Sequence, residues 1–205
     1  MKNKLSLLIC SFLICASLYS QEKKSSFYYG FGINNFGEIQ LNSVLDSSNI
    51  TPIKSSSFLL NVGFEYCPKK VGFYIEARQH IGYGENKLYG QNGILGLVYK
   101  AFNSESYTIK ILAQGKYAGY TALVNNQTNN STPQNLANAN GGLLHFKTSG
   151  AAFGTAIVYE RKSFGLKFGF DKTISAEPWR LSNNNYSSTV RESFNEFYFY
   201  IFKRF

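Results

Sequence analysis

Charged side chains recur at alternate positions in several segments of this chain whose other face is apolar. Opposite charges on one face can neutralise one another as ion pairs, whereas an unpaired enclosed charge is strongly destabilising. The pattern therefore predicts an internal charge network, serving either as structural ion pairs or as the selectivity residues of a pore. Its members are Glu65, Glu76, Arg78, Lys100, Lys110, Lys116, Glu160, Lys167, Asp171 and Glu196.

Nucleophilic catalysis is the other chemistry to weigh, and it needs a nucleophile, a base and an orienting acid within hydrogen-bond reach. The two histidines, His80 and His145, stand in the contexts "HIG" and "HFK". Neither lies in a His-x-Ser arrangement of the deacylase kind, and a lone histidine of this sort is more often structural. The cysteines show no metal-ligand spacing. We therefore expect no enzyme activity, no cofactor and no metal site.

The elements that position these residues are strands, because eight segments alternate apolar and polar residues with a period of two. Four segments show the pattern clearly (57–67, 71–83, 106–117 and 164–173), and four show it more weakly (27–41, 93–102, 149–161 and 192–205). A content of 17% aromatic residues and 18 glycines also favours strands with many turns. The sequence predicts an all-β fold, an eight-stranded antiparallel barrel of up-and-down connectivity.

The connections between these segments alternate in length. Three are tight turns with the sequences "CPKK", "NSES" and "ERKS", whereas the others, at 42–56, 84–91, 118–148 and 174–191, are long and polar. Short turns on one rim and long loops on the other are typical of transmembrane barrels. Both termini then lie on the short-turn side. The Asn-rich stretch 125–142 is expected to be a mobile, solvated loop.

Alternation alone does not say which face is outside, because a secreted lipocalin-like barrel also alternates, with its apolar face inward. Each segment, however, has an aromatic residue on its apolar face near the short-turn end. One ring per strand at a common depth is typical of a membrane-interface girdle. This observation favours an apolar face that meets lipid. The girdle residues are Phe27, Tyr66, Phe73, Tyr99, Tyr107, Tyr159, Phe164 and Phe205.

The first twenty residues have the pattern of a cleavable signal peptide. Lys2 and Lys4 precede an apolar run that ends before the polar "QEKK". The run is about 14 residues long, short of the ~20 that a spanning helix needs, so an uncleaved anchor is disfavoured. Removal of residues 1–20 lowers the formal charge from +9 to +7 and leaves Cys67 as the one remaining cysteine of a barrel domain at 21–205.

The chain finishes with "EFYFYIFKRF", in which Phe197, Phe199, Ile201 and Phe205 share one face. This ending resembles the C-terminal assembly signal of Gram-negative outer-membrane β-barrels, although Lys203 departs from the apolar residue usual there. The resemblance implies recognition by the barrel-assembly machinery, periplasmic termini, and a final location among outer-membrane lipid and lipopolysaccharide. A lysine near the interface can extend toward water. Lys203 is therefore compatible with the barrel fold and affects only the match to the C-terminal assembly signal.

As a pattern, residues 27–205 resemble small eight-stranded outer-membrane proteins of the OmpA-barrel and OmpX type. An eight-stranded lumen is just wide enough for side chains. The resemblance implies a structural or surface-interaction role through the external loops, with a lumen plugged by charged and aromatic side chains. The alternative is a narrow, porin-like ion or small-solute channel that prefers anions weakly. The scattered Lys and Arg residues argue against nucleic acid, and no extracellular partner is indicated.

Overall fold

The computed structural model describes residues 25–48, 50–126, 142–182 and 187–205. The predicted signal peptide, 1–20, and most of the Asn-rich stretch 125–142 lie outside these residues. None of the helices within these residues is long and apolar enough to cross a membrane.

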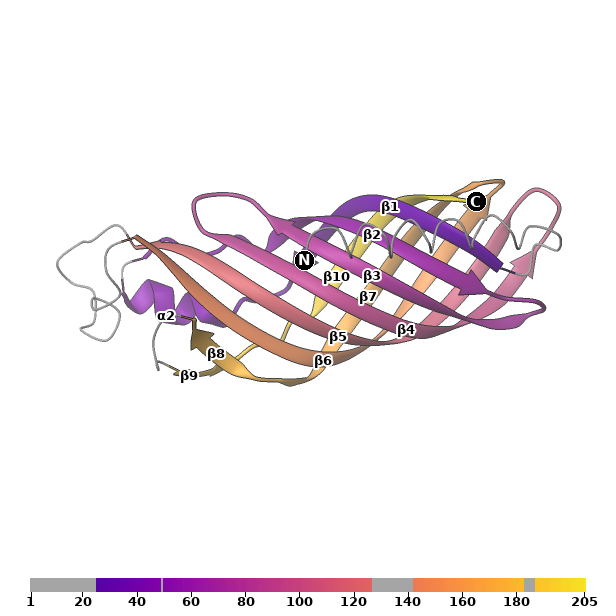
Figure 1. The fold of residues 1–205 in the computed structure, drawn as a ribbon. Coiled ribbons are helices and arrows are strands. Elements are labelled where there is room, and N and C mark those ends of the chain that lie inside the picture. Colours follow the sequence, from indigo (N-terminus) through magenta and orange to yellow (C-terminus); the bar gives the residue numbers. More distant parts are fainter. Residues whose placement is uncertain (1–24, 49, 127–141, 183–186) are drawn as a thin grey trace, which may run out of the picture.

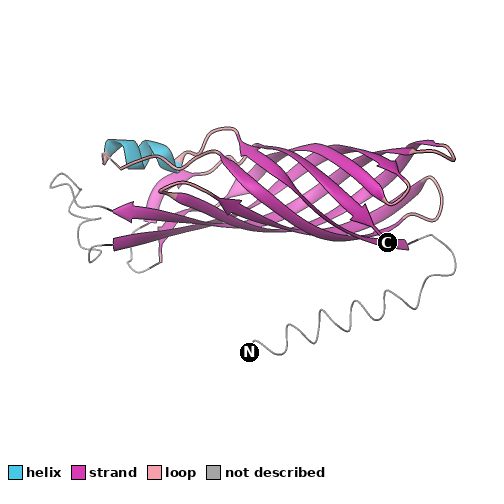
Figure 2. Ribbon diagram, turned by 90° about the horizontal axis from the view of Figure 1, so that it is seen from above, coloured by secondary structure: helices cyan, strands magenta, loops and turns pink. Residues whose placement is uncertain are grey.

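Eight long strands form one closed antiparallel barrel (Figures 1 and 2). They are β1 (Ser25–Phe36), β2 (Ser56–Tyr66), β3 (Val71–Gly82), β4 (Lys87–Asn103), β5 (Thr108–Asn126), β6 (Gly142–Arg161), β7 (Phe164–Ala176) and β10 (Glu196–Arg204). Neighbours in sequence pair throughout the barrel, except that β7 pairs with β10, and β10 pairs with β1 to close it. The predicted fold class is confirmed, including the final strand that pairs with the first.

The barrel wall extends further toward the long-loop end than the sequence prediction allowed. Strand β4 begins at Lys87 rather than at residue 93, and β5 and β6 take up about half of the predicted loop 118–148. The alternation simply continues there, with Ala118, Tyr120 and Ala122 all buried. The prediction missed it because small residues give a weak hydrophobic signal.

Two other predicted loops contain regular structure. The segment 42–56 contains most of α2 (Leu41–Ser47), and 174–191 contains β8 (Pro178–Leu181) and β9 (Ser187–Arg191). Strand β8 pairs with β6 and extends the sheet at the long-loop end. Strand β1 also ends at Phe36 instead of continuing to residue 41.

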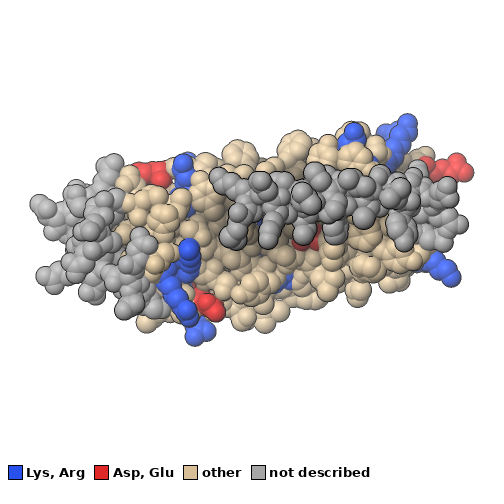
Figure 3. Space-filling view, viewed as in Figure 1, with Lys and Arg blue, Asp and Glu red and all other residues tan. Residues whose placement is uncertain are grey.

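The apolar face of the barrel is outside. Phe31 is 64% exposed and Leu95 is 63% exposed, whereas Arg78 inside the wall is only 2% exposed. Figure 3 shows most charged atoms of the visible face near its two ends, with uncharged atoms between them. A continuous apolar surface of this size is tolerated in lipid and not in water, and a closed barrel satisfies its backbone hydrogen bonds internally. The fold is that of a transmembrane β-barrel.

Inside the barrel, large rings lie directly against glycines of the neighbouring strand. In each case the two residues are cross-strand partners, and a Cβ on the glycine would overlap the ring. The narrow lumen therefore leaves room for each of these rings on the side where the neighbouring strand carries a glycine. The pairs are Tyr28 with Gly63, Tyr74 with Gly96, Tyr120 with Gly90, Tyr198 with Gly169, and Phe202 with Gly165.

This packing predicts that Gly169→Val destabilises the barrel by about 1–3 kcal/mol, the usual cost of overpacking. The matched control is Gly119→Val, because a Cβ at Gly119 meets nothing within 4 Å. Urea unfolding of the refolded chain in detergent, followed by gel mobility of unboiled samples, measures both. Equal stability of the two variants would contradict the proposed packing.

Candidate functional site

The centre of the lumen is organised around Arg78, a β3 side chain that is 2% exposed. Its Nε donates to Glu76 Oε1, and its Nη1 donates to Asp171 Oδ2 on β7 at 3.2 Å. The guanidinium carbon also lies 3.9 Å from the ring centroid of Tyr198. One cation thus joins two carboxylates and an aromatic face across the barrel, in the planar geometry that suits arginine.

Glu76 is the most heavily coordinated carboxylate in the described part of the lumen. Besides Arg78, its Oε2 accepts from Lys167 Nζ at 3.0 Å, from the hydroxyl of Tyr28 at 2.7 Å and from that of Tyr200 at 2.6 Å. These partners come from four strands, so the carboxylate cross-links opposite walls. Full coordination of this kind is what makes a buried charge tolerable.

Two further groups continue the network toward the ends of the barrel. On the long-loop side, Lys116 Nζ lies 2.7 Å from Glu196 Oε1 and 3.3 Å from Asp171 Oδ2. On the short-turn side, Lys110 Nζ lies 2.6 Å from Glu65 Oε1 and 2.7 Å from Glu160 Oε2. Both lysines bridge two carboxylates, so no described carboxylate of the lumen lacks a cation.

Nine of the ten residues predicted for the charge network lie in it, and Lys100 does not. Lys100 is at the short-turn end, where its Nζ donates to the carbonyl of Cys67 at 2.9 Å. Its place is taken by Arg204, which pairs with Glu65 at 2.9 Å and with Glu160. The alternation of the last strand placed Arg204 on the inner face, so a signal for it existed. The network holds five cations and five carboxylates.

His80 has the neighbours of a hydrolytic triad but the wrong hydrogen bonds. The Nδ2 of Asn92 donates to His80 Nε2 at 2.8 Å, so Nδ1 carries the proton and points to Ser57 Oγ at 3.4 Å. A protonated Nδ1 does not take a proton from the serine. Ser57 is also buried, with 2% exposure. His80 is a hydrogen-bonded interior residue. The described part of the chain contains no group of three or more His, Cys, Asp or Glu side chains placed to hold a metal ion.

The residues predicted for the girdle lie on the outer face at the short-turn end. Rings of neighbouring strands meet there: Tyr66 with Phe73 at 5.6 Å between centroids, and Tyr107 with Tyr159 at 5.7 Å. The set is completed by Phe27 on β1, Tyr99 on β4, Phe164 on β7 and Phe205, which directly follows β10. Phe197, Phe199 and Ile201 also face outward from β10, and the ammonium of Lys203 lies 5.4 Å from the ring centroid of Phe205. The partial exposure of Lys203 fits a lysine at a membrane interface.

An apolar core, here called the cap, closes the long-loop end of the barrel. Helix α2 contributes Leu41 and Leu45, which pack with Phe36 and Phe194 above the polar lumen. Trp179 on β8 belongs to this core and is fully buried. Both roles considered for Trp179 from sequence, an anchor for a partner and a ring at the outer lipid interface, require exposure and are therefore wrong.

A single carboxylate, Glu192, connects the pieces of this cap. It accepts hydrogen bonds from the backbone N–H groups of Gln40 at 2.9 Å and Leu41 at 2.8 Å, and from the indole Nε1 of Trp179 at 2.7 Å. Burial raises the pKa of Glu192 above its ordinary value of 4.5, and the three donors offset part of this rise. No local pattern in the sequence indicates this role of Glu192, because its partners lie 13 to 152 residues away.

Removal of the Arg78 guanidinium leaves the carboxylates of Glu76 and Asp171 buried without the cation that they share. We expect Arg78→Met to lower the free energy of unfolding by about 3–5 kcal/mol. The matched control, Lys100→Met, removes one hydrogen bond at a half-buried position and is expected to cost about 1 kcal/mol. Urea titration of both refolded variants measures the difference, and an Arg78→Met barrel as stable as the control would disprove a central role.

The raised pKa of Glu192 favours its protonated form in the folded cap. Its contribution to stability is therefore greatest below the unfolded pKa and is lost as pH rises through the folded pKa. We expect acrylamide to quench Trp179, the only tryptophan in the chain, more strongly at pH 8 than at pH 4. Glu192→Gln should abolish this dependence, whereas Glu177→Gln, at an exposed position, should retain it. A pH dependence that survives Glu192→Gln would assign it to another group.

No protein-family model matches the chain, and no curated protein matches its sequence. Similar solved structures include Ail, the attachment invasion locus protein of Yersinia pestis, at 10% identity and a TM-score of 0.49, covering 88% of this chain and 97% of that one. Neisserial surface protein A has 13% identity and a TM-score of 0.48, covering 89% and 98%.

The N-terminal β-barrel domain of Pseudomonas aeruginosa OprF has 11% identity and a TM-score of 0.46, covering 90% and 100%. The assignment of the present chain rests on its own geometry: the closed strand order, the apolar outer face and the charged, buried interior. By these features the chain is a small eight-stranded transmembrane β-barrel.

Proposed function

We infer that this protein resides in the outer membrane of a Gram-negative bacterium, with both termini in the periplasm and its long-loop end outside. Its role is structural or one of surface interaction, carried by the long-loop end, and it is not an enzyme. The assembly machinery recognises its C-terminal strand, and lipid and lipopolysaccharide surround it.

The observation that carries this proposal is the ion-pair network that joins opposite walls of the lumen. Between Tyr28, Glu65 and Tyr74 the remaining gap is about 10 Å³, and a second gap beside Lys116 and Tyr120 has the same volume. A gap of this size accommodates about one water molecule. A hydrated ion is larger, so these points favour a closed lumen.

The cap at the long-loop end supports the same conclusion. An ion entering from that side meets the core of Phe36, Phe146 and Trp179 before it reaches the ion-pair network. An apolar plug over a charged lumen opposes ion entry, because the ion loses its hydration without a polar replacement. The cap instead presents an ordered surface, formed by α2, β8 and β9, on which a contact with another molecule can be built.

The alternative, a narrow channel that prefers anions, draws its selectivity from an excess of lumen cations. The described network offers no such excess, because its five cations face five carboxylates. Each cation is also held at ion-pair distance rather than free to bind a passing anion.

We expect the refolded chain, residues 21–205, to show no stable unit conductance in a planar bilayer. The matched variant Glu76→Ala/Arg78→Ala removes one charge of each sign from the centre and should conduct if the network closes the lumen. Gel mobility of unboiled samples confirms that both barrels form. Stable anion-selective conductance of the unmodified chain would overturn the proposal in favour of the channel.

A further inference from the structure

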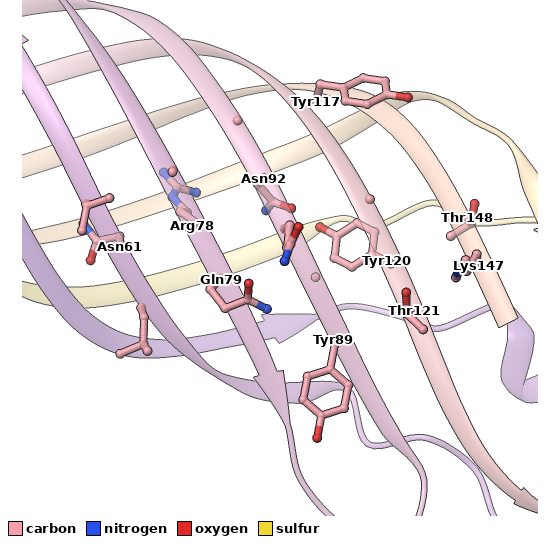
Figure 4. A pocket seen from close by; sticks show the side chains of 17 residues that line it. Asn61, Arg78, Gln79, Tyr89, Asn92, Tyr117, Tyr120, Thr121, Lys147 and Thr148 are labelled. Atoms are coloured by element: carbon pink, nitrogen blue, oxygen red, sulfur yellow. The ribbon is translucent and has the colours of Figure 1, made fainter. Parts of the chain in front are cut away.

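A groove of about 820 Å³ lies at the wall of the barrel over β2 to β6 (Figure 4). Outward-facing side chains form most of its lining, and the buried lumen residues Asn61, Arg78, Asn92, Tyr120 and Thr148 also contribute to it. Its floor is open because Gly93 and Gly119 carry no side chains and a Cβ at either would meet nothing within 4 Å. Tyr89 and Tyr117 lie at opposite borders in Figure 4. The volume lies in the range of sites that hold a substantial ligand.

The composition of the groove changes along its length. Val62 and Ala77, which are cross-strand partners, border an apolar part. Gln79 and Gln91, also cross-strand partners, lie nearer the long-loop end, where Leu60 is the other cross-strand neighbour of Gln79. Amide side chains on a lipid-facing wall are costly unless they meet polar groups, and Gln79 Nε2 meets one in the carbonyl of His80 at 3.1 Å. The groove is therefore amphipathic, with one end suited to hydrocarbon and the other to a polar head.

Two cations stand directly opposite one another beyond the polar end. Lys147 on β6 borders the groove, is the cross-strand partner of Arg180 on β8, and both side chains are exposed. Like charges in this position repel and destabilise a sheet. Among the described residues neither cation forms an ion pair, and Glu177, which precedes β8, pairs with neither. An anion bound between them would remove the repulsion.

The depth of this pair matches a lipid headgroup. Lys147 lies twelve residues along β6 from Tyr159 of the short-turn girdle. At about 3.4 Å per residue and a strand tilt of about 40°, the separation along the membrane normal is about 30 Å. This equals the thickness of a bilayer hydrocarbon core, so Lys147 and Arg180 lie at the level of headgroup phosphates in the opposite leaflet.

We propose that this groove is a binding site for a phosphorylated lipid of the outer leaflet, which places a phosphate between Lys147 and Arg180 and an acyl chain over Gly93 and Gly119. Arginine and lysine bind phosphate through charge-assisted hydrogen bonds. A neutral headgroup would leave the two cations unneutralised. The leaflet assignment rests on the proposed outer-membrane orientation, but the site itself is defined by the groove and the paired cations.

The test uses the refolded chain in a zwitterionic detergent, with bisphosphorylated lipid A as the probe and native mass spectrometry to count bound lipid. We expect Lys147→Glu/Arg180→Glu to weaken binding by about 30-fold or more, from the loss of two surface cations. The matched control, Lys69→Glu/Lys70→Glu, reverses two exposed lysines at the short-turn end and should leave binding unchanged.

Three further measurements decide the outcome. Gly93→Leu/Gly119→Leu fills the groove without touching a charge and should also abolish binding, while dephosphorylated lipid A should bind weakly to the unmodified chain. Excess inorganic phosphate should not displace the lipid. If the groove-filling variant binds normally, or if phosphate competes fully, the site is a simple anion patch and the proposal fails. Gel mobility of unboiled samples verifies folding of each variant.

Orientation is measured separately, so that failure of the lipid site and failure of the proposed function are distinguishable. In a Cys67→Ser background, a membrane-impermeant maleimide on intact cells should label Glu85→Cys, in the β3–β4 connection at the long-loop end, and not Ser104→Cys in a short turn. Labelling of Ser104→Cys alone would reverse the proposed orientation while leaving lipid binding in detergent unaffected. That result would move the site to the inner leaflet.

Discussion

Ionic neutrality inside a closed wall is the constraint on which the rest of this structure depends. Ten charged side chains occupy a lumen from which the barrel excludes bulk solvent, and each finds an opposite charge. Arg78 and Glu76 tie β3 to β7, β1 and β10. Because the partners come from opposite walls, the network constrains the circumference and the strand register together. A register slip by one residue would turn the charged side chains of the slipped strand toward lipid.

The second constraint is the width of the lumen. Eight strands leave a lumen just wide enough for side chains, and five of its rings gain space by lying against a glycine on one neighbouring strand. The same rings supply hydroxyl donors to the network, as Tyr28 and Tyr200 do for Glu76. Packing and electrostatics are thus carried by the same side chains, so their contributions to stability are not separable into independent parts.

The sequence predicted the repetitive features of the molecule and missed those that depend on distant contacts. Alternation assigned every strand to a face and brought nine network residues inside, because period 2 is a local property. It failed for Lys100, whose flexible side chain reaches a turn carbonyl at the end of the barrel. It failed for α2 and for Trp179, because the short helix and the indole are held by Glu192, a residue far away in sequence.

The proposed closure of the lumen would leave the function of the protein to its surfaces, and those surfaces are not uniform. Near β7 and β10 the outer wall is crowded with rings, such as Phe170 and Phe197 with centroids 4.6 Å apart. Over β4 and β5, between Tyr89 and Tyr117, the outer wall carries only hydrogen atoms at Gly93 and Gly119. Lipid alone does not require this difference, because a smooth apolar band suffices to hold a barrel in a bilayer. The proposed lipid site accounts for this difference, because the glycines allow close approach and the amides and paired cations suit the polar end of a phosphorylated lipid.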